Sequence, residues 1–278
     1  MGNQNPLTSI FSEAEIAKLE QGKCLVSDGP ADESVQYILT DEFHRDFQLA
    51  LAAWFALAQE KCCGDHFCQR LRTTVNSWAS FLQVVGELTA GHFLYENVDS
   101  KVEYRCADGG ADFKCPLKGT PLYCEVKTLV GGNPPGTYSG GVRQATSRLR
   151  EDIDACCKQL DRGHTNLALM VDWWRPGIRY THLKEALWGR EVLTVPMNGS
   201  GPEWVRLRDG KFGPKQMTRI GAVGVLRSRG DRPHAWFLHN RSAQNPIAPE
   251  LLDPYSQLMP NGSWRNGTPD QPRPESNS

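Results

Sequence analysis

Long apolar runs are missing from this chain of 278 residues. No stretch approaches the roughly 20 apolar residues that a helix needs to cross a bilayer. The amino terminus also lacks a positive cluster followed by an apolar stretch, which is how a secretory signal begins. The sequence therefore predicts a protein with no membrane partner and a cytoplasmic location.

Several catalytic signatures are missing too. The chain has no P-loop and no Gly-rich dinucleotide fingerprint, which counts against ATP-driven chemistry within it. It has no nucleophile elbow and no cysteine-protease signature. A hydrolase that uses Cys62 or Cys63 with His66 or His92 is therefore a weak alternative.

The chain lacks an excess of either charge, since its formal net charge is −1. This balance argues against a protein that coats nucleic acid along its whole surface. Residues 203–232 are locally basic, and such a patch could neutralise phosphates. Solvated strand and turn positions explain the same residues equally well. The basic members of this segment are Arg206, Arg208, Lys211, Lys215, Arg219, Arg227, Arg229 and Arg232.

The chain has nine cysteines, an odd number that does not suggest a complete disulfide framework. Several of them fall on predicted apolar faces, where a free thiol behaves as a small hydrophobe. A reducing cytosol is the simplest interpretation. The cluster at residues 62–68 could suggest zinc, but no second ligand pair with recognisable spacing follows it. We expect a junction between two helices there. The cysteines on apolar faces are Cys106, Cys115, Cys124 and Cys156.

Hydrophobic periodicity predicts an α/β protein with helical and strand-containing extensions around a central core. Four segments are expected: an N-terminal helical extension at 1–66, a core at 67–198, a β-containing extension at 199–259 and a disordered tail at 260–278. The predicted helices span residues 12–20, 41–63, 67–89, 140–161 and 181–189. The predicted strands span residues 102–107, 111–115, 122–129, 166–171, 192–196, 220–226 and 236–240.

Three residues in the middle of the chain form the most informative pattern. On a strand over 121–129, Glu125 and Lys127 project from one face, about 7 Å apart. If the strand over 111–115 pairs with it as a hairpin, Asp112 lies beside both. Carboxylates suit Mg²⁺, and a lysine beside such a metal can orient or deprotonate a water molecule. The alternative is that Glu125 and Lys127 form the solvated face of an ordinary strand.

This layout resembles the PD-(D/E)xK nuclease superfamily. Ala111-Asp112 stands where that family has Pro-Asp, and Glu125-Val126-Lys127 where it has (D/E)-x-K. The proline is absent, as it often is among members of the family. The resemblance covers residues 71–172 and implies a restriction-endonuclease-like αβββαβ core, with a mixed sheet flanked by helices.

The resemblance also implies a metal site. Asp112, Glu125 and the Val126 carbonyl would bind Mg²⁺, for which Mn²⁺ would substitute, and Lys127 would act on the attacking water. The helix before the first strand often supplies a glutamate in this family, and Glu87 fits by position. An exposed glutamate on the helix surface is the alternative for Glu87.

Further residues are expected around this site. Gln144 fits a polar assisting residue near the start of the helix over 140–161, and Arg143 is a second candidate there. Arg143, Arg148, Lys215 and Arg219 are candidates for contacts with nucleic acid. A solvated helix face would explain the arginines of this helix as well.

The expected function is hydrolysis of nucleic-acid phosphodiester bonds by a metal-dependent nuclease. DNA is favoured as substrate and an endonuclease as the type of enzyme. A catalytically inactive module of the same fold, binding nucleic acid or protein, is the alternative. A homodimer or a partner subunit in anti-phage defence or restriction is compatible with either, by analogy of fold alone.

Overall fold

The computed structural model describes residues 5–22, 35–106, 110–129, 141–172, 180–194, 202–212, 217–229 and 232–252. For residues 141–145, 180, 228–229 and 232–234 it describes the backbone and not the side chains. Lys215 and the tail expected at 260–278 lie outside the described residues.

A mixed six-stranded sheet forms the centre of the molecule, with the strand order β1-β2-β3-β4-β7-β8. The first three strands are antiparallel neighbours, β3, β4 and β7 run parallel, and β8 returns antiparallel to β7. The strands are β1 (Glu103–Tyr104), β2 (Phe113–Leu117), β3 (Thr120–Thr128), β4 (Thr165–Asp172), β7 (Ala222–Arg229) and β8 (Arg232–His239). The predicted mixed α/β class is confirmed.

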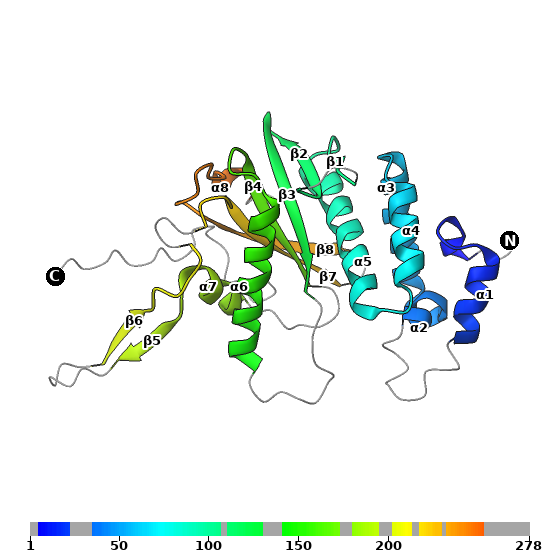
Figure 1. Ribbon diagram of the computed structural model, residues 1–278, viewed down its shortest axis with the longest axis horizontal. Helices are drawn as coiled ribbons and strands as arrows, with labels where there is room; N and C mark the ends of the chain where they lie inside the picture. Colours follow the sequence, from blue (N-terminus) through cyan, green and yellow to red (C-terminus); the bar gives the residue numbers. More distant parts are fainter. Residues whose placement is uncertain are drawn as a thin grey trace.

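Helices cover both faces of this sheet. Cys124 and Val126 of β3 join one buried cluster with helix α5, while Ala168 and Met170 of β4 join another with helix α6. Figure 1 shows α3, α4 and α5 side by side, with α1 and α2 beyond them. The helices are α1 (Glu13–Gly22), α2 (Val35–Thr40), α3 (Arg45–Glu60), α4 (Gly64–Thr74), α5 (Trp78–Phe93), α6 (Gly141–Gln159), α7 (Tyr180–Trp188) and α8 (Pro249–Leu252).

The central strand β4 is buried from Asn166 to Asp172. Its position between two parallel neighbours explains the continuous apolar sequence, because helices cover both of its faces. This burial was expected from the sequence and is confirmed. β7 and β8 extend the sheet beyond β4, so the segment at 199–259 contributes two strands to it.

The single helix expected over 67–89 is wrong. The chain breaks after α4 and starts again at α5, and Ser77 is the N-cap of the second helix. Its hydroxyl accepts a hydrogen bond from the Ser80 N–H at 3.4 Å. An N-cap serine satisfies a backbone donor that a helix leaves open, and this local preference outweighed the continuous apolar stripe. The boundary expected at 66/67 falls inside α4.

Local predictions at the N-terminal end hold better. Ser12 and Glu15 form a capping box before α1, with the Ser12 N–H bonded to the Glu15 carboxylate at 2.8 Å. The cysteine cluster lies at the junction of α3 and α4, where Cys62 has a φ of 62°. Cys63 is bonded to Cys106 in a disulfide, so the expectation of a free Cys106 thiol is wrong.

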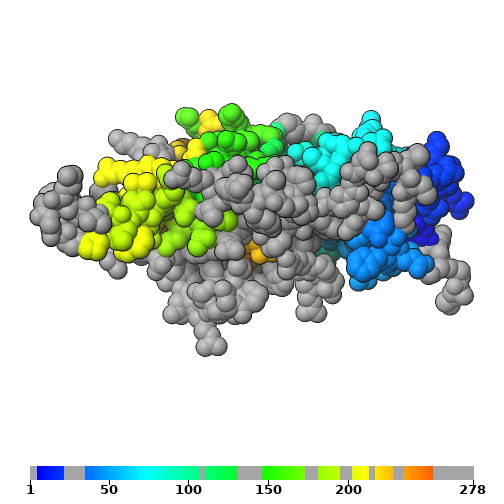
Figure 2. All heavy atoms as spheres, turned by 90° about the horizontal axis from the view of Figure 1, so that it is seen from below, coloured from blue at the N-terminus to red at the C-terminus, as the bar shows by residue number. Residues whose placement is uncertain are grey.

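A second, two-stranded sheet lies apart from the main one. It pairs β5 (Glu191–Thr194) with β6 (Glu203–Arg206) and projects from the side of α7 (Figure 1). In Figure 2 this hairpin (yellow-green) and the first helix (blue) occupy opposite ends of the visible face. None of the described helices is long and apolar enough to span a membrane.

Candidate active site

A tight hairpin fixes the register of the two strands that carry the predicted motif. Lys118 and Gly119 form its turn with φ values of 45° and 86°, as a two-residue type I′ turn requires. Pairing then runs from Leu117↔Thr120 to Phe113↔Cys124. One step further along the same register, Asp112 comes opposite Glu125. The sequence predicted this juxtaposition, although β2 begins one residue after Asp112.

The Asp112 carboxylate takes the place of a missing strand partner. Its Oδ2 accepts a hydrogen bond from the Val126 N–H at 2.8 Å. In an antiparallel ladder the N–H and C=O of one residue point to the same neighbour. The Val126 carbonyl therefore points to the same side as the Asp112 carboxylate, and its expected part as a metal ligand stays a prediction.

Glu125 is buried beside Asp112. Its exposed fraction is 2%, and its Oε2 has no hydrogen-bond partner among the described residues. Burial raises the pKa of Glu125, and the neighbouring Asp112 raises it further. Burial also raises the pKa of Asp112, with Glu87 as the next cause. The two neighbouring carboxylates thus oppose each other's ionisation.

This arrangement fits a divalent cation. A buried carboxylate oxygen without a partner costs free energy that a positive ion would recover. Mg²⁺ is usually held by one or two carboxylates together with water and substrate phosphate. Within the described part of the chain, no three His, Cys, Asp or Glu side chains gather as a metal centre.

Lys127 follows Glu125 on the same face of β3 and is half-buried. Both residues lie level with β4 residues that pack against α6, since Glu125 pairs with Ala168 and Lys127 with Met170. The sequence-based reasoning missed Asp152, a half-buried carboxylate on α6. Burial raises the pKa of Asp152, whereas Arg148 and then Lys127 lower it. Asp152 is therefore close enough to Lys127 for their charges to interact.

Glu87 reaches the site from α5. Its neighbour Gly86 lies against the end of β3, where an added Cβ would stand 1.9 Å from Thr128 Oγ1. This close approach places the C-terminal half of α5 against the carboxyl end of β3. As a result, the Glu87 charge is the second cause of the raised pKa of Asp112.

Arg70 of α4 holds the Glu87 carboxylate with both of its terminal nitrogens. Its Nη2 donates to Glu87 Oε1 at 2.7 Å, and its Nη1 donates to Oε2. Sequence-based reasoning missed this partner for a geometric reason. On one continuous helix, residues 70 and 87 would lie roughly 25 Å apart at 1.5 Å per residue. Only the break at Ser77, itself a visible capping signal, folds α4 back beside α5.

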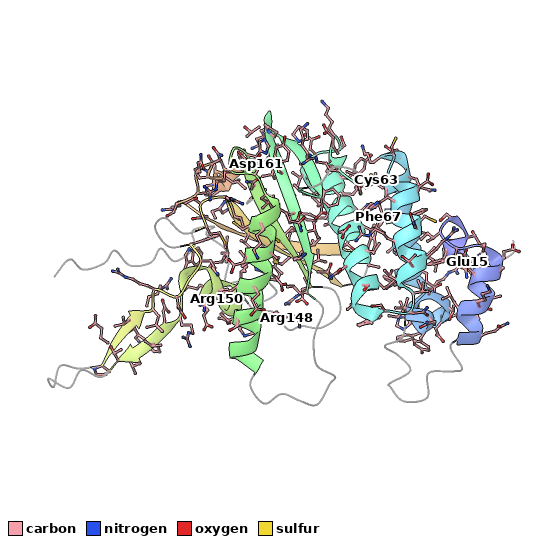
Figure 3. All side chains as sticks on the ribbon, in the orientation of Figure 1. Glu15, Cys63, Phe67, Arg148, Arg150 and Asp161 are labelled. Carbon is pink, nitrogen blue, oxygen red and sulfur yellow. A yellow bond between two sulfur atoms is a disulfide. The ribbon has the colours of Figure 1, made fainter. Side chains whose placement is uncertain are left out.

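The other predicted site residues are less closely gathered. Arg143 and Gln144 lie in the first turn of α6, where the structure describes the backbone alone. Arg148 is exposed on α6, on the side away from α7, whereas Arg150 faces α7 (Figure 3). Arg219 lies near the amino end of β4, where its Nη1 donates to the Cys157 carbonyl at 3.1 Å. It is thus at the opposite end of the sheet from Lys127.

In the basic segment at 203–232, three of the described cations are partly neutralised by acidic partners. Several of its cations are paired with acids on different elements, which disperses their charge. These pairs are Arg206–Glu191, Lys211–Asp154 and Arg227–Asp172. Cys63 has no free thiol to act as a nucleophile, because its sulfur is in the disulfide with Cys106.

Comparison with protein-family models, with curated proteins and with solved structures finds no match.

Proposed function

We propose that this chain is a metal-dependent nuclease that hydrolyses phosphodiester bonds in nucleic acid, with DNA the favoured substrate. The observation that carries the proposal is the pairing of Asp112 with Glu125, two carboxylates whose pKa values are both raised by burial. Lys127 lies on the same face of β3. Further support comes from the element order α5-β1-β2-β3-α6-β4, which resembles the αβββαβ core of the PD-(D/E)xK superfamily.

Each residue has a distinct part in the proposed reaction. Asp112, Glu125 and the Val126 carbonyl would hold Mg²⁺, which when bound supplies Lewis-acid polarisation of the phosphate and a more acidic water molecule. Lys127 orients the attacking water and offsets negative charge that develops on the phosphate oxygens. The Val126 N–H keeps the Asp112 carboxylate turned toward Glu125.

The direct test is a cleavage assay on single-stranded, duplex and structured DNA and RNA, with Mg²⁺ or Mn²⁺ present. We expect the parent to cleave at least one of these, and Asp112→Ala and Lys127→Ala to abolish cleavage. Glu103→Gln is the matched control, because Glu103 is exposed and its carboxylate is paired with Lys114. Variants that cleave as fast as the parent would refute the assignment.

The second candidate is a module that binds nucleic acid or protein without catalysis. The intact trio of Asp112, Glu125 and Lys127 speaks against it, since loss of catalysis in the resembled family usually removes one of these residues. Calorimetry separates the two candidates. A competent site binds Mn²⁺ and loses that affinity in Asp112→Ala, whereas a purely structural site shows no such dependence.

A further inference from the structure

An arginine that no sequence motif indicates lies at the edge of the candidate site. The Arg70 side chain is 33% exposed, whereas that of its partner Glu87 is 17% exposed. Glu87 follows Gly86, whose added Cβ would stand 1.9 Å from Oγ1 of Thr128, the β3 residue next to Lys127. Arg70 is therefore a cation beside the proposed metal-binding carboxylates that keeps access to solvent.

The guanidinium is held on several sides. Glu87 takes one N–H from each terminal nitrogen, and the ring of Phe67 lies 5.8 Å from Arg70 Cζ. His66, one turn earlier on α4, places its Nε2 3.4 Å from Arg70 Nη1. A guanidinium carries five N–H donors, so the pair with Glu87 leaves donors for another acceptor. Such a fixed, partly exposed arginine is suited to an anion that offers two oxygens to its planar guanidinium, such as phosphate.

The same contacts limit what Glu87 can do. Both of its carboxylate oxygens accept hydrogen bonds from Arg70. A bidentate pair with arginine is among the strongest side-chain interactions, and the Glu87 charge is already balanced there. A metal ion would have to compete with the guanidinium for this carboxylate, whereas Glu125 offers an oxygen with no described partner.

We propose that Arg70 contacts a phosphate of the bound nucleic acid next to the scissile bond, and that Glu87 is a positioning residue for Arg70. This inference rests on the proposed function and changes the expected role of Glu87, from metal ligand to support for a phosphate-binding arginine. It adds a contact on the α4–α5 side of the site.

The test measures binding of the full-length protein to fluorescent single-stranded and duplex DNA in EDTA, where no cleavage occurs, across a range of NaCl concentrations. Each phosphate contact contributes about 0.9 to the slope of log K against log salt on duplex and about 0.7 on a single strand. We expect the slope of Arg70→Gln to be less steep than that of the parent by about one such contact. Arg70→Lys should keep the slope, because it keeps the charge. Thermal unfolding of each variant shows whether it is folded.

A matched control lies on the same helix. Arg72 pairs with Glu15 and donates from Nε to the Ile10 carbonyl, so it faces the N-terminal segment. Arg72→Gln removes the same charge and should leave the salt slope unchanged. An equal loss of slope in both variants would mean that only overall charge matters, which overturns the inference.

Metal affinity provides the second measurement. Loss of an outer-shell partner of a metal ligand typically lowers metal affinity by roughly tenfold or more. We expect Glu87→Gln to lower Mn²⁺ affinity by less than this. The same variant should weaken DNA binding. A loss of Mn²⁺ affinity as large as that of Asp112→Ala would show that Glu87 is a metal ligand and would overturn the inference.

Failure of the inference differs from failure of the function. If the parent cleaves DNA but Arg70→Gln keeps the full salt slope, the inference alone fails. If the parent neither binds nor cleaves any nucleic acid, the proposed function fails and the inference with it.

Discussion

The Asp112 carboxylate accepts the Val126 N–H at 2.8 Å, at the point where β3 continues past the start of β2. The bond replaces the strand partner that Val126 lacks there and fixes the carboxylate beside Glu125. One residue thus completes the local backbone and contributes half of the carboxylate pair.

Replacing Asp112 with asparagine should separate these two roles. Asn still offers an oxygen to the Val126 N–H, so we expect the fold and thermal stability to persist. Loss of a charged ligand should lower Mn²⁺ affinity by at least about 100-fold, the upper range for an outer-shell partner. Calorimetric titration checks this, with Glu103→Gln as the control. Binding as tight as in the parent would remove Asp112 from the metal site.

The stability of the metal-free protein should depend on pH through the same pair. The folded pKa values of Asp112 and Glu125 are raised to about 7 and about 8, above the ordinary carboxyl values near 4. The folded state therefore binds protons more tightly than the unfolded state. The resulting stability is fully present below about pH 4 and is lost as the pH rises toward 8.

Thermal unfolding in EDTA between pH 4.5 and pH 8 measures this loss, roughly the window that these pKa values define. Glu125→Gln should flatten the dependence, because it removes one of the titrating groups. Added Mn²⁺ should raise Tm more at pH 8 than at pH 5.5, since metal competes with protons for carboxylates. A parent and a variant with identical pH profiles would contradict the assignment.

Gly86 should not tolerate a side chain. The new Cβ of Gly86→Ala would lie 1.9 Å from Thr128 Oγ1 and 3.0 Å from Thr128 Cβ, so the side chain cannot simply rotate away. Overpacking of this kind costs typically about 1–3 kcal/mol in the free energy of unfolding. Chemical denaturation measures it.

The double variant Gly86→Ala with Thr128→Ala should recover part of this loss, because it removes the nearest clashing atom. Gly163→Ala is the control, since its added Cβ would lie 3.8 Å from the nearest atom. Equal effects at Gly86 and Gly163 would show that α5 and β3 are not in close contact.

The disulfide between Cys63 and Cys106 joins the α3–α4 junction to the segment after β1. We expect a non-reducing digest to yield the two peptides linked, and Cys106→Ser to lower the free energy of unfolding by about 2–4 kcal/mol. Cys68→Ser is the control, because Cys68 is a half-buried free thiol. Recovery of the two peptides unlinked would show that both thiols are free.

Much of the fold could be predicted from periodicity. The alternation of Leu122, Cys124 and Val126 with Glu125 and Lys127 indicated which residues share a face of β3 and which face carries the charges. The continuous apolar run over 166–171 predicted a central strand. These predictions succeeded because each depends on local spacing that a strand converts directly into a face.

The rest depended on contacts between distant segments. Arg70 and Glu87 meet because α4 folds back on α5, and an apolar stripe running through both helices hid that break. Asp152 lies near Lys127 because α6 packs on the face of the sheet that carries Lys127. No residue spacing within α6 indicates that contact. The Cys63–Cys106 pairing likewise joins residues 43 apart, and nine cysteines allow too many pairings for sequence to choose among them.

Asp152 provides a last prediction about the reaction itself. Its carboxylate lies within electrostatic reach of Lys127, so its charge attracts the ammonium group. We expect Asp152→Asn to lower kcat by about tenfold, which corresponds to about 1.4 kcal/mol of transition-state stabilisation, with KM little changed. The adjacent Glu151 is exposed, and Glu151→Gln should have no effect. Thermal unfolding distinguishes this role from a structural one, because loss of an electrostatic contact with Lys127 should reduce kcat without lowering Tm. A lowered Tm together with the reduced kcat would assign Asp152 to packing of α6 instead.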